Sequence, residues 1–284
     1  MLRCSGCGVQ LLHPQPSNEQ LAQIYNEEYQ LAASTDKEIN CLDEMKTRTA
    51  KLYLEAFKEL DLPDNPRLLE VGCGWGHFLS EAVQAGFDSY GIEISGHAAK
   101  QAAKRLCAEK VLVSTMADAG FPPNSFDVCV MIDVIEHVRN PRLFLEEAVR
   151  LIKPGGYLFL VTPSTDCLSA RIMGRHWLEY KPEHLYAFSR RSMAHLLKSI
   201  NCRDLRFMPA KKALNLNFIV AYLGRFSVPV LTSVFRATCN LLPQNVLFRQ
   251  FVVPAGGMLV LARRDVTTPN ALRKKQQATA RNAT

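Results

Sequence analysis

The stretch Leu68-Leu69-Glu70-Val71-Gly72-Cys73-Gly74-Trp75-Gly76-His77 reads as an apolar strand that turns on three glycines into a helix. Glycines at alternate positions leave the backbone bare, so a ligand can lie against the free N–H groups at the start of the helix. The next apolar run ends in Glu93, and a carboxylate at that place binds both hydroxyls of a ribose in dinucleotide-binding folds. His77 stands where the NAD fingerprint G-x-G-x-x-G requires glycine. The glycine turn and Glu93 together predict a nucleotide-type site.

Strands and helices alternate along the chain around this turn. Apolar runs predict strands at 67–71, 88–94, 110–113, 126–131, 156–162, 204–209 and 257–263. Helical spacing of apolar residues predicts helices from Ser17, over 45–60, over 99–106, over 145–152 and from Ser189. Continuous apolar strands that alternate with helices indicate a parallel sheet covered on both faces, and hence an α/β fold.

The composition limits the class of protein. The 284 residues are 48% hydrophobic and 21% charged, which is ordinary for a globular chain and excludes a disordered chain, a fibre or a small disulfide-held protein. The N-terminus lacks the apolar core of a signal peptide, and no uncharged apolar run reaches the length of a membrane span. Nine cysteines, an odd number, favour reduced thiols and a cytoplasmic location.

Four motifs follow one another along the chain. They are Glu70–Gly76 with Glu93, FPPNSFD at 121–127, DVIEHV at 133–138 and LIKPGGY at 151–157. Over about residues 45–210 the chain resembles class I S-adenosylmethionine-dependent methyltransferases. The resemblance implies a Rossmann-like, doubly wound sheet of seven mostly parallel strands with an antiparallel last strand. It also implies S-adenosyl-L-methionine as the cofactor.

The same resemblance assigns the cofactor-binding residues, which are Glu70, Gly72, Gly74, Gly76, Glu93, Ile94, Met116, Ala117 and Asp133. The glycine turn is expected to hold the methionine part of the cofactor, and Glu93 the ribose. The loop around Met116 and Ala117 is expected to flank the adenine. Asp133 is expected beside the sulfonium, after the fourth strand of the core.

Asp133, Glu136 and His137 occupy positions i, i+3 and i+4, which places them together at the reactive end if the chain is helical there. With the later His184, this segment resembles the ligand pattern of metal-dependent small-RNA 2′-O-methyltransferases, although Asp133 replaces a glutamate and metal-free relatives share the segment. Three roles are open: ligands for Mg²⁺ or Mn²⁺, a base at His137 or His184, and a structural or acceptor-positioning role. Our prediction is that His137 and His184 are catalytic, without a metal.

The acceptor side of the chain is aromatic and basic. Residues 1–170 carry 15 basic and 23 acidic side chains, whereas basic residues dominate the remainder, which suggests an anionic partner. Trp177, Tyr180, Tyr186 and Phe188 are interspersed with arginines and lysines. They form either a lid over the cofactor, which we favour, or a surface that binds bases or a sugar ring.

Two further segments suggest partners. Residues 213–253 form an apolar insertion with three arginines and no acidic residue, which fits interfacial helices on anionic lipid, a helical cap over the acceptor pocket, or a homodimer surface. Cys4 and Cys7 resemble half of the zinc ribbon that begins a bacterial subgroup of these methyltransferases, together with Pro14-Gln15-Pro16-Ser17. Because a structural zinc site needs four ligands and no second close pair is present, we predict no zinc.

The predicted domains are an N-terminal CxxC segment with a helix (1–44), the cofactor-binding core (45–212), a helical cap insertion (213–253), the last core strand (254–264) and a disordered basic tail (265–284). The predicted function is methyl transfer to a small-molecule acceptor, with a hydroxyl of a saccharide or of a lipid-linked metabolite favoured. One alternative is a metal-dependent RNA 2′-O-methyltransferase, although nucleic acid is not the expected partner. The other is a non-catalytic cofactor-binding or membrane-associated adaptor.

Overall fold

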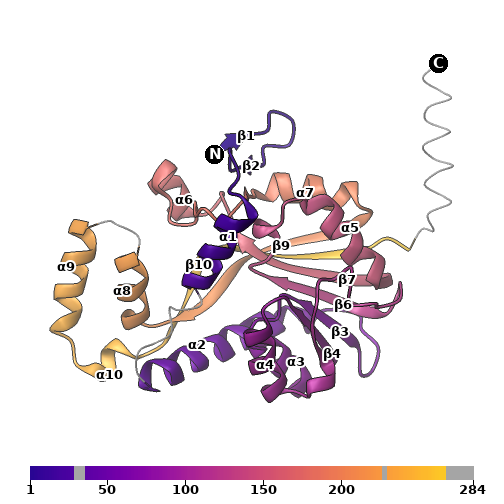
Figure 1. The fold of residues 1–284 in the computed structure, drawn as a ribbon, viewed down its shortest axis with the longest axis horizontal. Helices are drawn as coiled ribbons and strands as arrows, with labels where there is room; N and C mark the ends of the chain where they lie inside the picture. The colour runs from indigo at the N-terminus through magenta and orange to yellow at the C-terminus, as the bar shows by residue number, and fades with distance from the viewer. Residues whose placement is uncertain (29–35, 226–228, 267–284) are drawn as a thin grey trace.

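A seven-stranded sheet forms the centre of the molecule. The computed structural model describes residues 1–28, 36–225 and 229–266, and the sheet has the strand order β5-β4-β3-β6-β7-β10-β9 (Figure 1). Its strands are β3 (Arg67–Val71), β4 (Asp88–Glu93), β5 (Val111–Val113), β6 (Phe126–Ile132), β7 (Ile152–Pro163), β9 (Cys202–Leu214) and β10 (Phe251–Arg264). The first five pair in parallel, and β10 lies antiparallel between β7 and β9. The predicted α/β sheet is confirmed.

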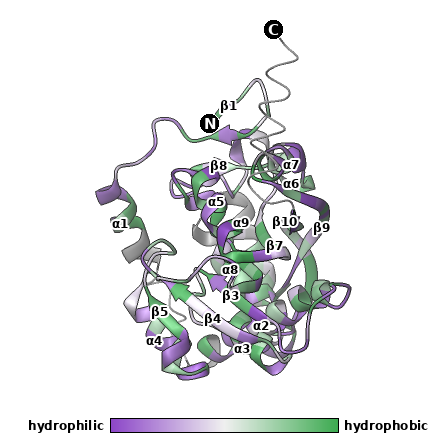
Figure 2. Ribbon diagram, turned by 90° about the vertical axis from the view of Figure 1, so that its right-hand side faces the viewer, coloured by the Kyte–Doolittle hydropathy of each residue, from purple (hydrophilic) through white to green (hydrophobic). Residues whose placement is uncertain are grey.

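Helices cover both faces of this sheet, because successive residues of a strand point to opposite sides. Leu68 belongs to the buried cluster on one face, and its neighbour Leu69 belongs to the cluster on the other. Figure 2 shows hydrophilic and hydrophobic segments in turn on the outer helices α5 and α7, as expected for helices with one buried side. The helices of the first face are α2 (Asp36–Leu54), α3 (His77–Gln84) and α4 (Gly96–Arg105), and those of the second are α5 (Pro141–Leu151) and α7 (Arg190–Ser199).

A small second sheet joins the N-terminus to the acceptor-side segment. Its strands, in spatial order, are β1 (Leu2–Arg3), β2 (Gln10–Leu11) and β8 (Tyr186–Ala187). Cys4 and Cys7 lie in the turn between β1 and β2 as free thiols. The N-terminal segment therefore packs against the acceptor-side segment.

Serine caps start two of the predicted helices. The Ser17 N–H donates to Gln20 Oε1 at 2.8 Å, and the Gln20 N–H donates to Ser17 Oγ at 3.2 Å, so helix α1 (Asn18–Glu28) begins directly after Ser17. Ser189 and Ser192 make the same reciprocal pair at the start of α7. Both predicted starts are confirmed.

Between β9 and β10 the chain leaves the sheet as a helical arm, residues 215–250. Its helices are α8 (Leu216–Arg225), α9 (Pro229–Asn240) and α10 (Gln244–Leu247), and Figure 1 shows them to one side of the sheet. Helix α6 (Leu168–Met173) and four short 3₁₀ turns complete the described elements: η1 (Glu55–Phe57), η2 (Ala108–Lys110), η3 (Ile135–His137) and η4 (Gly174–His176). No helix in the described part of the chain has both the length and the apolar character to cross a membrane.

Some boundaries differ from those expected. Helix α2 begins at Asp36 and crosses the predicted boundary at residue 44, because its polar first half has no apolar periodicity to predict it. Strand β7 begins at Ile152, four residues before the predicted start at 156, and its pairing with β6 is irregular there. Strands β9 and β10 are longer than predicted because they pair with each other past the sheet, as far as Leu214 and Phe251. The predicted tail lies outside the described residues from 267 onward.

Gly156→Ala is expected to destabilise the fold. A Cβ at this position would lie 2.6 Å from the carbonyl oxygen of Asp127 and 2.8 Å from Ile152 Cγ2, so strand β6 would have to shift. The free energy of unfolding should fall by roughly 1–3 kcal/mol. Gly96→Ala is the matched control, because nothing lies within 4 Å of its Cβ position. Urea unfolding of both variants measures the difference, and equal midpoints would contradict the close contact at Gly156.

Candidate functional site

The glycine turn lies at the carboxyl end of β3. Gly72, Gly74 and Gly76 have φ angles of 72°, 54° and 77°, in the left-handed region that side chains disfavour. A Cβ on Gly72 would lie 2.7 Å from Val134 Cγ2, and one on Gly76 would lie 2.9 Å from Ala102 Cβ. Nothing lies within 4 Å of the Cβ position of Gly74. The middle of the turn is therefore open to a ligand, while its two ends are packed.

Glu93 closes this turn from the neighbouring strand β4. Its Oε2 accepts a hydrogen bond from the Gly74 N–H at 2.9 Å, and its Oε1 accepts one from the Ser95 N–H at 2.8 Å. Ser95 caps α4 in its turn, since its Oγ accepts from the Ala98 N–H at 3.3 Å. The buried carboxylate thus joins two consecutive strand–helix turns. They lie at the edge of the sheet where open α/β folds bind their ligands.

Glu70 is a second buried acid at the end of β3. Its Oε2 has no hydrogen-bond partner among the described residues. Burial, reinforced by the charge of Glu93, raises the pKa of Glu70 well above its usual range. Leaving a buried polar atom unpaired costs about 1–3 kcal/mol, so the position favours a ligand group that supplies the missing hydrogen bond.

The predicted adenine-side residues lie after the adjacent strands β4 and β5. Ile94 directly follows Glu93 and is 72% exposed, which makes it an apolar surface beside the glycine turn. Ala117 is exposed, whereas Met116 packs in the core. Exposed apolar side chains beside the glycine turn are better suited to contact a planar ring of a ligand than a charged group of a ligand.

Asp133 follows β6 in a left-handed conformation, with φ of 54°. Its Oδ2 accepts a hydrogen bond from Lys212 Nζ at 2.8 Å, and both side chains are partly buried. Burial alone would raise the pKa of Asp133, but the charge of Lys212 outweighs it and lowers that pKa. The α-helical spacing considered for this segment does not form, because only the short turn η3 follows Asp133.

Glu136, His137 and His184 form a compact cluster beside Asp133. One ligand atom from each lies within 4.8 Å of the others, and the two imidazoles meet edge to face with ring centroids 4.8 Å apart. Burial lowers the pKa of His137, and it lowers that of His184 to about 3. Burial and the charge of Asp133 raise the pKa of Glu136 to about 8. The structure brings the two histidines predicted as catalytic together, in their neutral form at neutral pH.

Residues that the sequence did not point to line the same end of the sheet. The buried hydroxyl of Tyr53 on α2 has no hydrogen-bond partner in the described part of the chain, and it lies near enough to Lys212 and Asp133 for their charges to act on it. Tyr222 of the helical arm donates to Glu179 Oε1 at 2.9 Å. These residues come from distant segments, and no motif links them. The one sequence feature that could have pointed to this group is Tyr53, whose hydroxyl is a polar group on the buried face of α2.

The aromatic side chains between β7 and α7 are largely packed into the protein. Trp177 and Phe188 are buried, and Tyr186 is half-buried. The Tyr180 hydroxyl donates to Gln10 Oε1 at 2.6 Å, which ties the segment to strand β2. Rings held in this way do not offer open faces to bases, so their placement fits the predicted lid better than a nucleic-acid surface.

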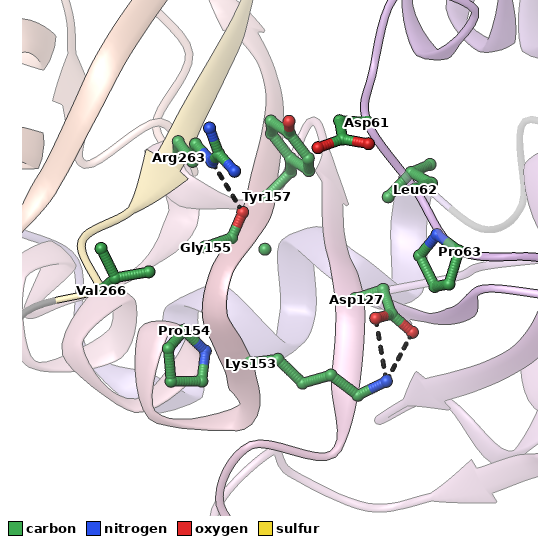
Figure 3. A pocket seen from close by; sticks show the side chains of 11 residues that line it. Asp61, Leu62, Pro63, Asp127, Lys153, Pro154, Gly155, Tyr157, Arg263 and Val266 are labelled. Carbon is green, nitrogen blue, oxygen red and sulfur yellow. Dashed lines mark hydrogen bonds and ion pairs between the residues drawn. The ribbon is translucent and has the colours of Figure 1, made fainter.

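A separate hollow lies at the opposite, amino-terminal edge of the sheet (Figure 3). Within it, Lys153 Nζ donates to both carboxylate oxygens of Asp127 at 2.8 Å. Asp127 also accepts from the Arg67 N–H at 2.9 Å, so it ties the starts of β3, β6 and β7 together. The hollow lies away from the glycine turn and has a structural ion pair as its main polar feature.

Comparison with known proteins shows which families and proteins this chain is similar to. The family described as "Methyltransferase domain" matches residues 42–206, more than half of the chain. A mitochondrial ubiquinone biosynthesis O-methyltransferase of Schizosaccharomyces pombe is 27% identical over 155 residues, covering 51% of this chain and 57% of the relative. The ubiquinone biosynthesis O-methyltransferase of Idiomarina loihiensis is 26% identical over 181 residues, covering 55% and 73%. The chain thus spans little more than half of the first of these relatives.

Solved structures share the fold at low sequence identity. A SAM-dependent methyltransferase from Archaeoglobus fulgidus is 18% identical, with a TM-score of 0.52, and the match covers 86% of this chain and 99% of that one. The cyclase SpnF is 17% identical, with a TM-score of 0.56, and the match covers 89% and 99%. A cyclase among these neighbours illustrates that the fold alone does not fix the reaction. Because the family match takes in the glycine turn, Glu93 and Asp133 alike, this chain belongs to the methyltransferase-domain family.

Proposed function

We propose that this protein transfers a methyl group from S-adenosylmethionine to a hydroxyl of a small-molecule acceptor. The observation that carries the proposal is the Glu93 carboxylate, which clasps an open glycine turn from the adjacent strand. The cofactor supplies a methyl group already activated on a sulfonium, so the protein needs to align the reactants and exclude water. The names of the curated relatives, which are O-methyltransferases, support an oxygen acceptor.

On the donor side, the bare turn at Gly74 holds the methionine part of the cofactor, and the carboxylate of Glu93 holds its ribose. The unpaired Oε2 of Glu70 is placed to bind a polar group of the methionine part. Ile94 and Ala117 border the adenine, with Met116 behind them in the core. Each of these groups is fixed by the sheet, so the donor site is preorganised.

On the acceptor side, Asp133 lies at the reactive end, with Lys212 balancing its charge. His137 and His184 face the same end, and burial keeps both imidazoles unprotonated. A neutral imidazole accepts a hydrogen bond from a hydroxyl and orients its oxygen for attack. We therefore assign His137 and His184 to the acceptor oxygen.

The favoured acceptor is a saccharide or a lipid-linked metabolite. Support comes from the helical arm, which contributes Tyr222 to the acceptor side and is largely apolar. An apolar wall with a few polar groups is typical of sites for small molecules with one reactive hydroxyl. The RNA alternative has weaker support, because the aromatic rings it would need are packed. The adaptor alternative leaves the acceptor-side cluster without a role.

Glu93→Gln is expected to weaken binding of S-adenosylhomocysteine. A charged acceptor of hydrogen bonds contributes about 1.5–3 kcal/mol, so the dissociation constant should rise roughly 10- to 100-fold. Isothermal titration calorimetry measures it, and urea unfolding of the free protein checks that the fold persists. Glu109→Gln, on the exposed turn η2, is the control and should bind like the wild type. Unchanged affinity for Glu93→Gln would remove the basis of the proposed function.

The acceptor class is tested with methyl-tritiated S-adenosylmethionine and two substrates, a bacterial small-molecule and lipid extract and purified total RNA. We expect label in the extract and none in RNA. The Glu93→Gln variant should lose this labelling. Label in RNA that Mg²⁺ stimulates and His137→Ala abolishes would favour the RNA alternative instead.

We also propose that the helical arm contacts anionic membrane surfaces. Leu241 is 85% exposed, and Val246, five residues further along the arm, is 39% exposed. Arg236 and Arg249 are exposed on the same arm. Exposed apolar and cationic side chains together favour binding at a lipid interface.

The double variant Leu241→Glu/Val246→Glu should pellet several-fold less with phosphatidylglycerol vesicles than the wild type does. Leu143→Glu, on the exposed side of α5, is the matched control and should pellet like the wild type. Equal pelleting of all three proteins would contradict membrane contact. Self-association of the wild type in solution, lost in the double variant, would instead identify the arm as a homodimer surface.

A further inference from the structure

Three lysines from distant segments of the chain converge on the acceptor side of the site. Lys46 lies on helix α2, Lys181 in the segment before β8, and Lys212 on strand β9. Lys181 and Lys212 are near enough to Lys46 for their charges to lower its pKa. Because like charges that lie close together repel one another, this arrangement favours an anionic ligand.

Two of these lysines have an acidic partner, and the third does not. Lys212 Nζ donates to Asp133 Oδ2 at 2.8 Å, and Lys181 Nζ lies 3.3 Å from Glu179 Oε2. Lys46 forms no ion pair with any residue that the structure describes. The two ion pairs therefore leave the ammonium group of Lys46 as an uncompensated cation on this side of the site.

Lys46, Lys212 and Asp133 line a recess of the protein. The side chains of Lys212 and Asp133 are 32% and 39% exposed, and Lys46 is exposed as well. Desolvation is nevertheless the strongest influence on the pKa of each of these three groups. Groups that solvent can reach, although protein surrounds them on most sides, lie in a hollow that a ligand can enter.

Tyr53 is an independent sign that a ligand is expected here. Its side chain is buried, at 2% exposure, and its hydroxyl has no hydrogen-bond partner among the described residues. Burial raises the pKa of this hydroxyl, so it keeps its proton and is available as a donor. A buried donor without a partner favours a ligand that brings an acceptor oxygen.

Lys46 and Tyr53 lie on the same face of α2, because their spacing corresponds to about two turns of a helix. This face lies against strand β9. Thr49, which is between them, accepts a hydrogen bond on its Oγ1 from the Ala213 N–H at 3.0 Å, and Ala213 directly follows Lys212 in the strand. The ammonium group of Lys46, the hydroxyl of Tyr53 and the side chain of Lys212 are therefore neighbours.

We propose that Lys46, Tyr53 and Lys212 bind an anionic group of the acceptor, which is a carboxylate or a phosphate. That this group belongs to the acceptor rests on the proposed function. Its oxygens accept hydrogen bonds from the ammonium group of Lys46 and from the hydroxyl of Tyr53, and Lys212 adds a second positive charge. The acceptor is thus held by its anionic end, while its hydroxyl meets His137 and His184.

Anion binding is measured by isothermal titration calorimetry on the full chain saturated with S-adenosylhomocysteine. The probes are phenyl phosphate and benzoate, and benzyl alcohol is the neutral probe of similar shape. We expect one of the two anions to bind at least about tenfold more tightly than benzyl alcohol, and the tighter anion identifies the group as phosphate or carboxylate. If neither anion binds more tightly than benzyl alcohol, the proposal is wrong.

Three variants locate the subsite. Lys46→Met should weaken binding of the preferred anion roughly tenfold or more, since it removes a charged donor. Tyr53→Phe should weaken it about threefold to tenfold without lowering the free energy of unfolding, because the lost hydroxyl has no partner in the free protein. Lys211→Met is the matched control, since it removes the same charge from an exposed neighbour on the opposite face of β9. If Lys46→Met binds the anion as tightly as Lys211→Met does, Lys46 is not part of an anion site.

A titration of Lys46→Met with S-adenosylhomocysteine alone separates the acceptor from the cofactor, whose methionine part also carries a carboxylate. The variant should bind S-adenosylhomocysteine within about threefold of the wild type. A larger loss would place the carboxylate of the cofactor at Lys46 and overturn the proposal. None of these titrations requires methyl transfer. If the anion binds as expected but no hydroxyl is methylated, the anion subsite stands and the proposed function fails. If a hydroxyl is methylated but neither anion binds, the proposed function stands and the subsite fails.

Discussion

The Glu93 carboxylate is the interaction on which the site depends. It accepts one hydrogen bond from each of two neighbouring strand–helix turns, at Gly74 and at Ser95. A parallel sheet puts the carboxyl ends of β3 and β4 at one edge, and the acid then fixes the distance between the two turns. The open space at Gly74 and the apolar surface of Ile94 follow from this placement. The same carboxylate is thus a structural tie, and under the proposed function it is also the ligand of the ribose diol.

The acceptor side is assembled differently from the donor side. The donor side comes from consecutive turns of the core, whereas Tyr53, Lys212 and Tyr222 come from α2, β9 and the helical arm. Lys212 and Tyr222 lie beyond the matched residues 42–206. The donor-side residues therefore lie within the matched region, whereas the acceptor side also draws on residues outside it. Figure 1 shows that the helical arm extends from the ends of the long strands β9 and β10.

The local structure of the donor side, from the glycine turn to the serine caps, is predictable because its signals are local, whereas the binding roles of its residues stay predictions. A glycine turn, an acid at the end of the next strand and serine caps each need only a few consecutive residues to be read. The reactive end is harder to predict from the sequence. The i, i+3 spacing of Asp133 and Glu136 is informative only if the backbone is helical, and Asp133 adopts a left-handed conformation instead. The ion pair with Lys212 joins residues far apart in the sequence. Contacts of this kind have no periodicity, so composition alone does not reveal them.

The register of the long antiparallel pair has a consequence for how such enzymes diversify. Strands β9 and β10 remain hydrogen-bonded as far as Leu214 and Phe251, so the two ends of the helical arm are held side by side. A segment with clamped ends can be lengthened, shortened or exchanged at little entropic cost and without disturbing the strands that carry it. Under the proposed function, in which the arm borders the acceptor, an exchange of residues 215–250 can therefore change the acceptor and leave the sheet that carries Glu93 intact.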